Sequence, residues 1–317
     1  MGYLAKKGDV ILYGVEGSYG SAAATARVFG IVDEVTEPTY DRQIETKHAH
    51  GSANPQYYEG DLQKYTGGAI VVTNQRPEFW EYIIGASSDS GAGPYDHTLD
   101  PDDNVSSLTI AIAKKDTAGT VVVKKQFVGS CIGKLKVTGK KGSVVKSEIN
   151  FDCQKVVNTS DSLTFSIQAN EEPICFKGVT VEVDSTAIST INDWEWTFER
   201  ALNSTDGNNS TLIQHMSADD WTSTTTIKYA YTQQDEEDWF HGASGGTQDQ
   251  CATSRQITVT VTNGEAGTAE RTIVLDATSG RFSTFQYTGY DGHLIAQLVS
   301  KNKSIQVVTT DNTADWA

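Results

Sequence analysis

The chain has 317 residues, of which 38% are hydrophobic and 21% are charged, a balance typical of a folded domain and unlike that of a disordered one. Its 41 acidic and 25 basic residues give a net charge of −16 at pH 7. Binding along a phosphate backbone needs clustered cations, so this charge argues against a protein that wraps nucleic acid. The excess acid could keep DNA from adhering nearby, or could serve solubility alone.

The first residues of the chain and its cysteines indicate the kind of cellular compartment in which the protein is expected. No long apolar run follows Met1, and we expect neither a signal peptide nor a membrane helix. The four cysteines form no Cys-x-x-Cys pair, which argues against a zinc or redox motif, and Cys131 and Cys153 lie in strand-like segments as expected for buried hydrophobic residues. We therefore predict a reducing compartment and no cofactor.

Residues 36–64 form the first long polar segment between the predicted strands. Loops of this length are usually functional or disordered. Glu45, His48 and His50 within it could supply metal ligands, since an extended His-x-His places both rings on one face. Because no second ligand cluster follows, a plain polar loop is favoured.

One short α-helix is predicted next. Pro77 occupies its first turn, where a missing N–H costs little. Phe79 with Ile83, and Trp80 with Ile84, form apolar pairs at i,i+4 spacing. We expect this helix to plug one side of a β-sandwich or partial barrel.

Period-two alternation dominates the rest of the chain and predicts antiparallel strands. The segment from Val145 to Cys153 places Val145, Ile149, Phe151 and Cys153 on one face and Lys146, Glu148, Asn150 and Asp152 on the other. A Gly-rich turn over residues 138–143 joins it to a strand over 134–137 as a hairpin. Similar alternation runs through residues 108–112, 179–183, 194–198, 227–231 and 257–261, and Asn263-Gly264 and Ser279-Gly280 mark later turns.

A second polar segment, over residues 204–223, is predicted as another long loop. The whole chain is interpreted as a single β domain over 1–317, with a peripheral extension after about residue 221 left open on grounds of length.

Catalytic patterns are weak, and we expect no enzyme. The acidic run Asp235–Asp238 before Trp239 could supply a carboxylate pair, but adjacent residues rarely give the separation that glycosidases need. A carbohydrate-binding module or adhesin is the main alternative, with Trp194, Trp196, Tyr229 and Tyr231 as a stacking platform. Large aromatic residues on alternating positions are more often core.

The stretch from Tyr13 to Ser21, YGVEGSYGS, resembles the opening of tail tube proteins of long-tailed phages and archaeal tailed viruses. The order that follows is also similar: a strand near 28–35, a long loop, a strand near 69–73, a short helix, an acidic turn, and the 127–153 hairpin. The similarity covers nearly the whole chain and lies in this arrangement rather than in any specific motif, and it is weakest after about residue 221.

The resemblance implies a non-enzymatic subunit that forms stacked hexameric rings, in which each subunit adds strands to one β-barrel around a lumen. DNA would pass through this lumen without sequence-specific binding. The implied partners are further copies of the chain and tape-measure, tail-terminator or tail-tip proteins. The implied location is the virion, after assembly in the host cytoplasm. We expect the ring-stacking loop to use Tyr40, Glu45, His48, His50, Tyr57 and Tyr58, and the lumen strands to use Lys134, Lys136, Lys146, Glu148, Asn150 and Asp152.

Five lysines crowd the hairpin proposed for the lumen and fit an acidic lumen poorly: Lys134, Lys136, Lys140, Lys141 and Lys146. Either they pair with acidic neighbours, or they lie on the outer face, or the strand assignment is wrong.

Overall fold

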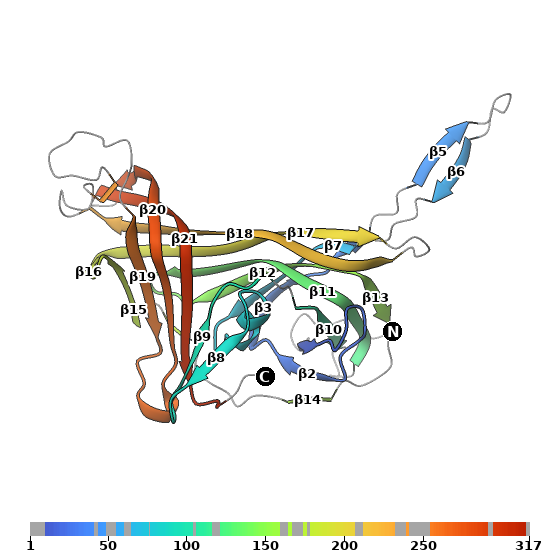
Figure 1. Ribbon diagram of the computed structural model, residues 1–317, viewed down its shortest axis with the longest axis horizontal. Helices are drawn as coiled ribbons and strands as arrows, with labels where there is room; N and C mark the ends of the chain where they lie inside the picture. The colour runs from blue at the N-terminus through green and yellow to red at the C-terminus, as the bar shows by residue number, and fades with distance from the viewer. Residues whose placement is uncertain are drawn as a thin grey trace.

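The computed structural model describes residues 10–40, 44–48, 55–59, 65–75, 77–103, 106–115, 121–158, 164–166, 174–175, 178–206, 212–231, 239–240, 254–290 and 294–314. This part of the protein is mainly β, as the alternation predicts: nearly all its strands join one large sheet that is not closed into a barrel. All ladders are antiparallel except one short parallel pair. Figure 1 shows the strands arranged as two layers joined by long, bent strands.

The first layer gathers the N-terminal strands. Its ladders join β1 to β2 and β10, β10 to the first half of β11, β11 to β13, and β2 to β14. The second half of β11 passes into the other layer, so that one strand links both. The strands are β1 (Val10–Val15), β2 (Thr25–Val28), β10 (Leu108–Lys115), β11 (Val121–Lys140), β13 (Lys155–Asn158) and β14 (Thr164–Ser166).

The second layer is the main sheet, in the order β3-β7-β12-β11-β17-β18-β21-β20-β19-β15-β16. The predicted hairpin over 134–153 is part of this sheet, because β11 pairs with β12 from Thr138–Lys146 onward. These strands are β3 (Ile31–Thr36), β7 (Tyr65–Thr73), β12 (Lys146–Cys153), β15 (Val179–Val183), β16 (Thr186–Ala187), β17 (Ile191–Asp206), β18 (Ile213–Ala230), β19 (Arg255–Thr262), β20 (Thr272–Tyr290) and β21 (Leu294–Asp311).

Strands β20 and β21 bend partway along. The first part of β21 pairs with β18, and its last part pairs with β9. Strand β9 in turn pairs with β8 as a hairpin. In Figure 1 β17 and β18 run across the molecule, whereas β19, β20 and much of β21 run in a different direction, crossing them at one end. The remaining strands are β4 (Thr39–Tyr40), β5 (Ile44–His48), β6 (Pro55–Glu59), β8 (Ser87–Ser90) and β9 (Tyr95–Leu99).

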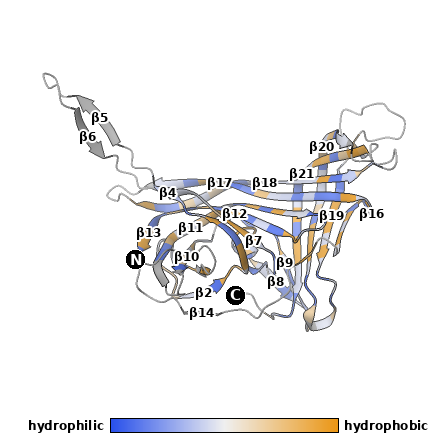
Figure 2. Ribbon diagram, turned by 180° about the vertical axis from the view of Figure 1, so that it is seen from behind, coloured by the Kyte–Doolittle hydropathy of each residue, from blue (hydrophilic) through white to orange (hydrophobic). Residues whose placement is uncertain are grey.

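Alternation along the strands separates a dry face from a polar one, which Figure 2 shows as alternating colours along each ribbon. Along β12 the buried residues are Ser147, Ile149, Phe151 and Cys153, preceded by the buried Val145. This confirms the predicted inner face. The hydrophobic core lies between the dry face of the main sheet and the N-terminal layer.

The predicted helix is a 3-10 helix, η1 (Glu78–Tyr82), and not an α-helix. Its position is as expected, because Phe79 and Trp80 are almost fully buried in the core. Phe79 packs edge-on against Phe29, and Trp80 lies 6.3 Å from Trp196 of the main sheet between ring centroids. One tight turn is enough to insert two large rings, and a longer α-helix is not needed. A second 3-10 turn, η3 (Gly267–Ala269), follows the turn at Asn263-Gly264.

Three predicted irregular segments are wrong. The segment 204–223 is not a long loop, since β17 runs to Asp206 and β18 begins at Ile213. The segment 36–64 contains β4, β5 and β6. Ser279-Gly280 lies inside β20, at register shifts between β20 and β21, and marks a bend rather than a turn. Ser, Thr, Asn and Asp suggest loops by composition, but on solvent-facing strand positions they cost little.

Candidate assembly surface

The predicted lumen residues lie together on the polar face of the main sheet. Lys134 is opposite Asn150 and Lys136 is opposite Glu148 in the β11–β12 ladder. Side chains directly opposite each other in an antiparallel pair share a face. The side chains of Lys146, Glu148, Asn150 and Asp152 are half-buried, in alternation with the buried core residues of β12. The strand assignment is therefore confirmed, and a role in a lumen stays a prediction.

Three of the five lysines of the hairpin pair with acidic neighbours, the first of the three possibilities raised by the sequence. Lys134 Nζ lies 3.5 Å from Glu199 Oε2, and Lys136 Nζ lies 2.8 Å from Glu195 Oε2. Lys146 Nζ lies 2.8 Å from Asp33 Oδ2 on β3. These half-exposed pairs contribute at most about 1 kcal/mol each. Their main effect is to neutralise the centre of the face.

A shallow hollow opens on this face where β7, β12, β11 and β17 meet. It has a volume of about 340 Å³ and is lined by polar and charged side chains, by Phe151 and Leu202, and by Gly67 and Gly133. Because these glycines have no side chains, the sheet surface is locally low. The other lining residues include Lys134, Asn150, Asp152 and Glu199, so four strands contribute to one depression.

The predicted ring-stacking residues fall mostly on the β5–β6 hairpin. Glu45 and His48 belong to β5, and Tyr57 and Tyr58 belong to β6, with Glu45 opposite Tyr58 in register. His50 lies outside the described residues. Figure 1 draws this hairpin projecting from the body. Tyr40 lies on β4 and stacks on Tyr65 of β7, with ring centroids 4.9 Å apart.

The base of this projecting segment is fixed by charge. Glu37 accepts hydrogen bonds from two lysines of the N-terminal layer: Lys114 Nζ at 2.5 Å from Oε1, and Lys125 Nζ at Oε2. Partial burial by itself would raise the pKa of the Glu37 carboxyl, but the two lysines outweigh it and lower the pKa below its ordinary value. Alternation along the chain could not predict this contact, because the three residues lie far apart in the sequence.

The N-terminal motif YGVEGSYGS is organised by one buried carboxylate. Glu16 Oε1 accepts hydrogen bonds from the Thr109 hydroxyl and the Gly129 amide, both at 2.8 Å, and Oε2 accepts one from the Gly20 amide at 2.9 Å. Gly20 and Gly129 have positive φ values of 77° and 67°. The motif is thus a structural loop that locks β1 onto β10 and β11, which explains why it needs glycine around a glutamate.

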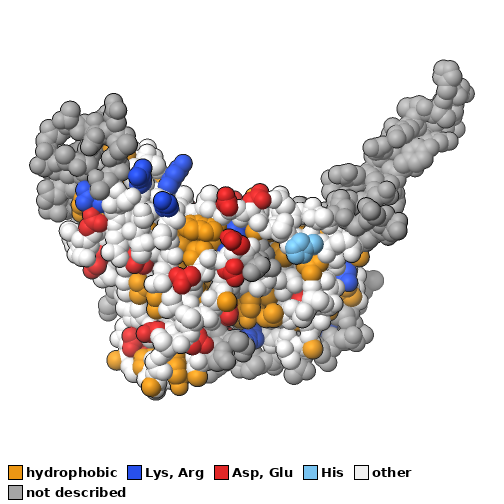
Figure 3. Space-filling view, viewed as in Figure 1, with side chains coloured by type: hydrophobic (Ala, Val, Ile, Leu, Met, Phe, Trp, Pro, Cys, Tyr) orange, Lys and Arg blue, Asp and Glu red, His pale blue; other side chains and the backbone are white. Residues whose placement is uncertain are grey.

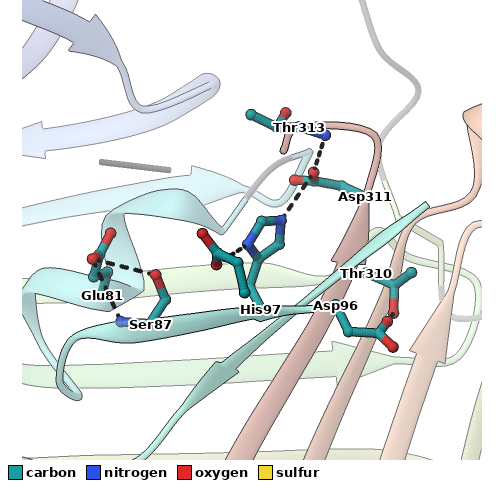
Figure 4. A network of polar contacts seen from close by, with 8 residues as sticks. Glu81, Ser87, Asp96, His97, Thr310, Asp311 and Thr313 are labelled. Carbon is teal, nitrogen blue, oxygen red and sulfur yellow. Dashed lines mark hydrogen bonds and ion pairs between the residues drawn. The ribbon is translucent and has the colours of Figure 1, made fainter. Parts of the chain in front are cut away.

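A buried histidine connects the end of β21 to the β8–β9 hairpin (Figure 4). His97 Nδ1 lies 2.7 Å from Asp89 Oδ1, and Nε2 lies 3.3 Å from Asp311 Oδ1. Asp311 also accepts a hydrogen bond from the Thr313 amide at 2.6 Å. An Asp–His pair can serve a nucleophile, but Figure 4 shows a chain of contacts that holds three strands together. We interpret it as a structural tie of the C-terminal strand.

The aromatic residues considered for a sugar-stacking platform lie in the core. Trp194, Trp196 and Tyr229 are almost fully buried, and Tyr231 is partly buried. A stacking platform needs an exposed ring face, so these residues do not form one. The run Asp235–Asp238 lies outside the described residues.

The first edge of the main sheet is open in the described part of the chain. Strand β3 pairs with β7 on one side and has no described ladder on the other. Ile31 at its start is a large apolar residue that is 45% exposed. Unpaired edges invite pairing with another chain.

Compared with known proteins, the chain matches no protein-family model and no curated protein sequence. No helix among the described residues has the length and hydropathy required to cross a membrane.

Proposed function

We propose that the protein is a structural subunit of a viral tail tube, which stacks as rings into a hollow conduit for genome passage and is located in the virion. The observation that carries the proposal is the main sheet itself. It is wide and has one dry face and one polar face, and among the described residues it stays open at β3 instead of closing on itself. A sheet of this kind is what a subunit needs if neighbouring copies complete a barrel.

The polar face suits the wall of a water-filled channel. Its strands carry charged and hydroxyl side chains outward over β12, β11, β17 and β18. Each of three lysines there lies beside a carboxylate. Paired in this way, the lysines offer a phosphate backbone little free positive charge, so DNA could slide past without adhering.

The projecting β5–β6 hairpin is the proposed contact between successive rings. The chain shortly before it, at Glu37, is held to the N-terminal layer by contacts with Lys114 and Lys125. In a homo-oligomeric ring, β3 of one copy would contact a different surface of the neighbouring copy, which is a heterologous contact. Tape-measure, terminator and tip proteins are the further partners that the proposal implies.

The proposal is tested by assembly of the purified chain. Light scattering after size exclusion and negative-stain microscopy should show rings or tubes at micromolar to millimolar concentration. Ile31→Lys places a charge on the open edge and should abolish them, because charged residues block edge pairing. Tyr287→Lys is the matched control, since Tyr287 is similarly exposed, at 48%, and lies on β20. The proposal needs no other tail protein for assembly. A purified native chain that stays monomeric at all concentrations would therefore contradict it.

A further inference from the structure

The bend of β20 and β21 carries a group of cations that we call the cation corner: Arg281, Lys301 and Lys303. Arg281 and Lys301 are directly opposite each other in the ladder, and Lys303 follows two positions along β21. All three side chains are exposed. Figure 3 shows Lys and Arg side chains gathered near the upper ends of β20 and β21.

The three cations surround a hollow. It has a volume of about 450 Å³, and its other lining residues are Ser254, Ser279, Ser283 and Phe282. Ser254 precedes β19, which pairs with β20 at Arg255–Gly280, so three neighbouring strands contribute to one opening. Hydroxyl groups and cations therefore line the same wall.

This arrangement costs free energy in the absence of a ligand. Like charges directly opposite in an antiparallel pair are destabilising. Within the described residues no carboxylate lies at ion-pair distance from Arg281, Lys301 or Lys303, whereas the nearby Arg255 lies 2.6 Å from Asp184 Oδ2. Three cations at one place with no acidic partner in the described part of the chain are unexpected at a net charge of −16.

The backbone beneath the corner is rigidly supported. The side chain of Asn302 lies on the dry face and donates hydrogen bonds to Ser223 Oγ and Thr225 Oγ1, both at 3.0 Å. It also accepts one from Ser300 Oγ at 3.0 Å. A Cβ at Gly280 would lie 2.7 Å from Ser300 Oγ, so only glycine allows this close approach. Support of this kind fixes the strand positions that carry Arg281 and Lys301 before any ligand arrives.

The cation corner presents more hydrogen-bond donors than one carboxylate can accept. Arginine presents five N–H donors in a planar fork, and each lysine presents three. A carboxylate has two acceptor oxygens, whereas a phosphate group has three or four that point in different directions and carries more charge. The volume of the hollow, about 450 Å³, is ample for such a group.

We propose that the cation corner is a phosphate-binding site, in which Arg281 and Lys301 hold the phosphate oxygens and Lys303 and the serine hydroxyls complete the shell. The site lies within a single chain and does not depend on ring assembly. The same chemistry would accept a free phosphate ion or a phosphodiester of nucleic acid.

Titration calorimetry with inorganic phosphate, at constant ionic strength kept with sodium chloride, tests the proposal. The native protein should bind one phosphate per chain saturably. The double variant Arg281→Gln/Lys301→Gln should weaken binding at least tenfold. Lys228→Gln is the control, because Lys228 is a cation of the same sheet that lies 3.6 Å from Asp193 Oδ2, and it should bind phosphate as the native protein does.

A short DNA duplex, titrated separately, distinguishes the two sources of phosphate. If the double variant also loses affinity for DNA, the site accepts a phosphodiester; if only the free ion loses affinity, the site is specific for a free phosphate. Non-saturable binding by the native protein, or equal phosphate affinity in the native protein and the double variant, would overturn the proposal. The double variant should stay folded, because it removes like-charge repulsion and no buried contact.

Discussion

Two clusters of neighbouring cations in this molecule are built in opposite ways. In the N-terminal layer Lys114 and Lys125 converge on one carboxylate, Glu37, and their charges are neutralised. At the bend of β20 and β21 Arg281 and Lys301 face each other directly, and the described residues around them provide no carboxylate within ion-pair distance.

The difference shows where this chain uses charge to hold itself together and where it keeps charge available. The centre of the main sheet follows the first pattern, with Lys134, Lys136 and Lys146 each beside an acid. An internal ion pair needs no ligand, while an unpaired group of cations is stabilised by anything that brings negative charge. The following substitutions test this contrast, beginning with the support beneath the cation corner.

Replacing Asn302 by Ala should have the largest effect. It removes three buried hydrogen bonds, to Ser223, Thr225 and Ser300, and leaves Ser223 Oγ only the bond from Trp196 Nε1. We expect the free energy of unfolding to fall by about 2–3 kcal/mol, measured by urea denaturation. Asn203→Ala is the control, because Asn203 makes its bond to Asp219 on the exposed surface, and its effect should be below about 0.5 kcal/mol. Equal losses in both variants would show that the buried network is unimportant.

Gly280→Ala should reshape the bend. The added Cβ would lie 2.7 Å from Ser300 Oγ and 3.0 Å from Ile257 Cδ1, so these buried side chains must shift. We expect a loss of about 1–2 kcal/mol in the free energy of unfolding, together with weaker phosphate binding.

Gly289 provides the matched control on the same strand. A Cβ there meets nothing within 4 Å, and Gly289→Ala should leave both stability and phosphate binding unchanged. If Gly280→Ala were as harmless as this control, the bend would not depend on close packing.

Glu37→Gln should remove the neutralising acid from the N-terminal cluster. Folding lowers the pKa of Glu37 below its ordinary value near 4.5, so the carboxylate stabilises the protein above that pH and loses this effect as the pH falls through the lower, folded value. With allowance for solvent screening, we expect a loss of about 1 kcal/mol at pH 7. Urea denaturation at pH 7 and pH 3 should show the difference from the native protein shrinking at the lower pH. A difference that does not change with pH would mean that Glu37 acts through packing alone.

Alternation predicted the strands and the two faces of the main sheet well, because a half-buried strand leaves a period-two pattern in its own residues. It placed Lys134, Lys136 and Asp152 on the polar face correctly. It could not find Glu37 beside Lys114 and Lys125, or Arg281 opposite Lys301, because those contacts depend on how strands pair. Ser279-Gly280 was misread as a turn, since a bend inside a long strand and a turn between strands both favour small residues.

Lys301→Gln should have the smallest effect and the most informative sign. Removing one of two like charges that face each other should raise the free energy of unfolding by about 0.2–0.5 kcal/mol in low salt without phosphate. Lys228→Gln removes a cation that has a carboxylate partner and should leave the free energy of unfolding unchanged or lower it.

Salt and phosphate test the cause of these effects. In 1 M salt the Debye length falls to about 3 Å, and the effects of both substitutions should shrink. In saturating phosphate the native protein should be more stable than Lys301→Gln, the reverse of the order without phosphate. The reason is that only the native protein then gains the full stabilisation by the bound ligand. A Lys301→Gln variant that is destabilised without phosphate would mean that an acidic partner already neutralises the corner, and that its cations belong to the first pattern.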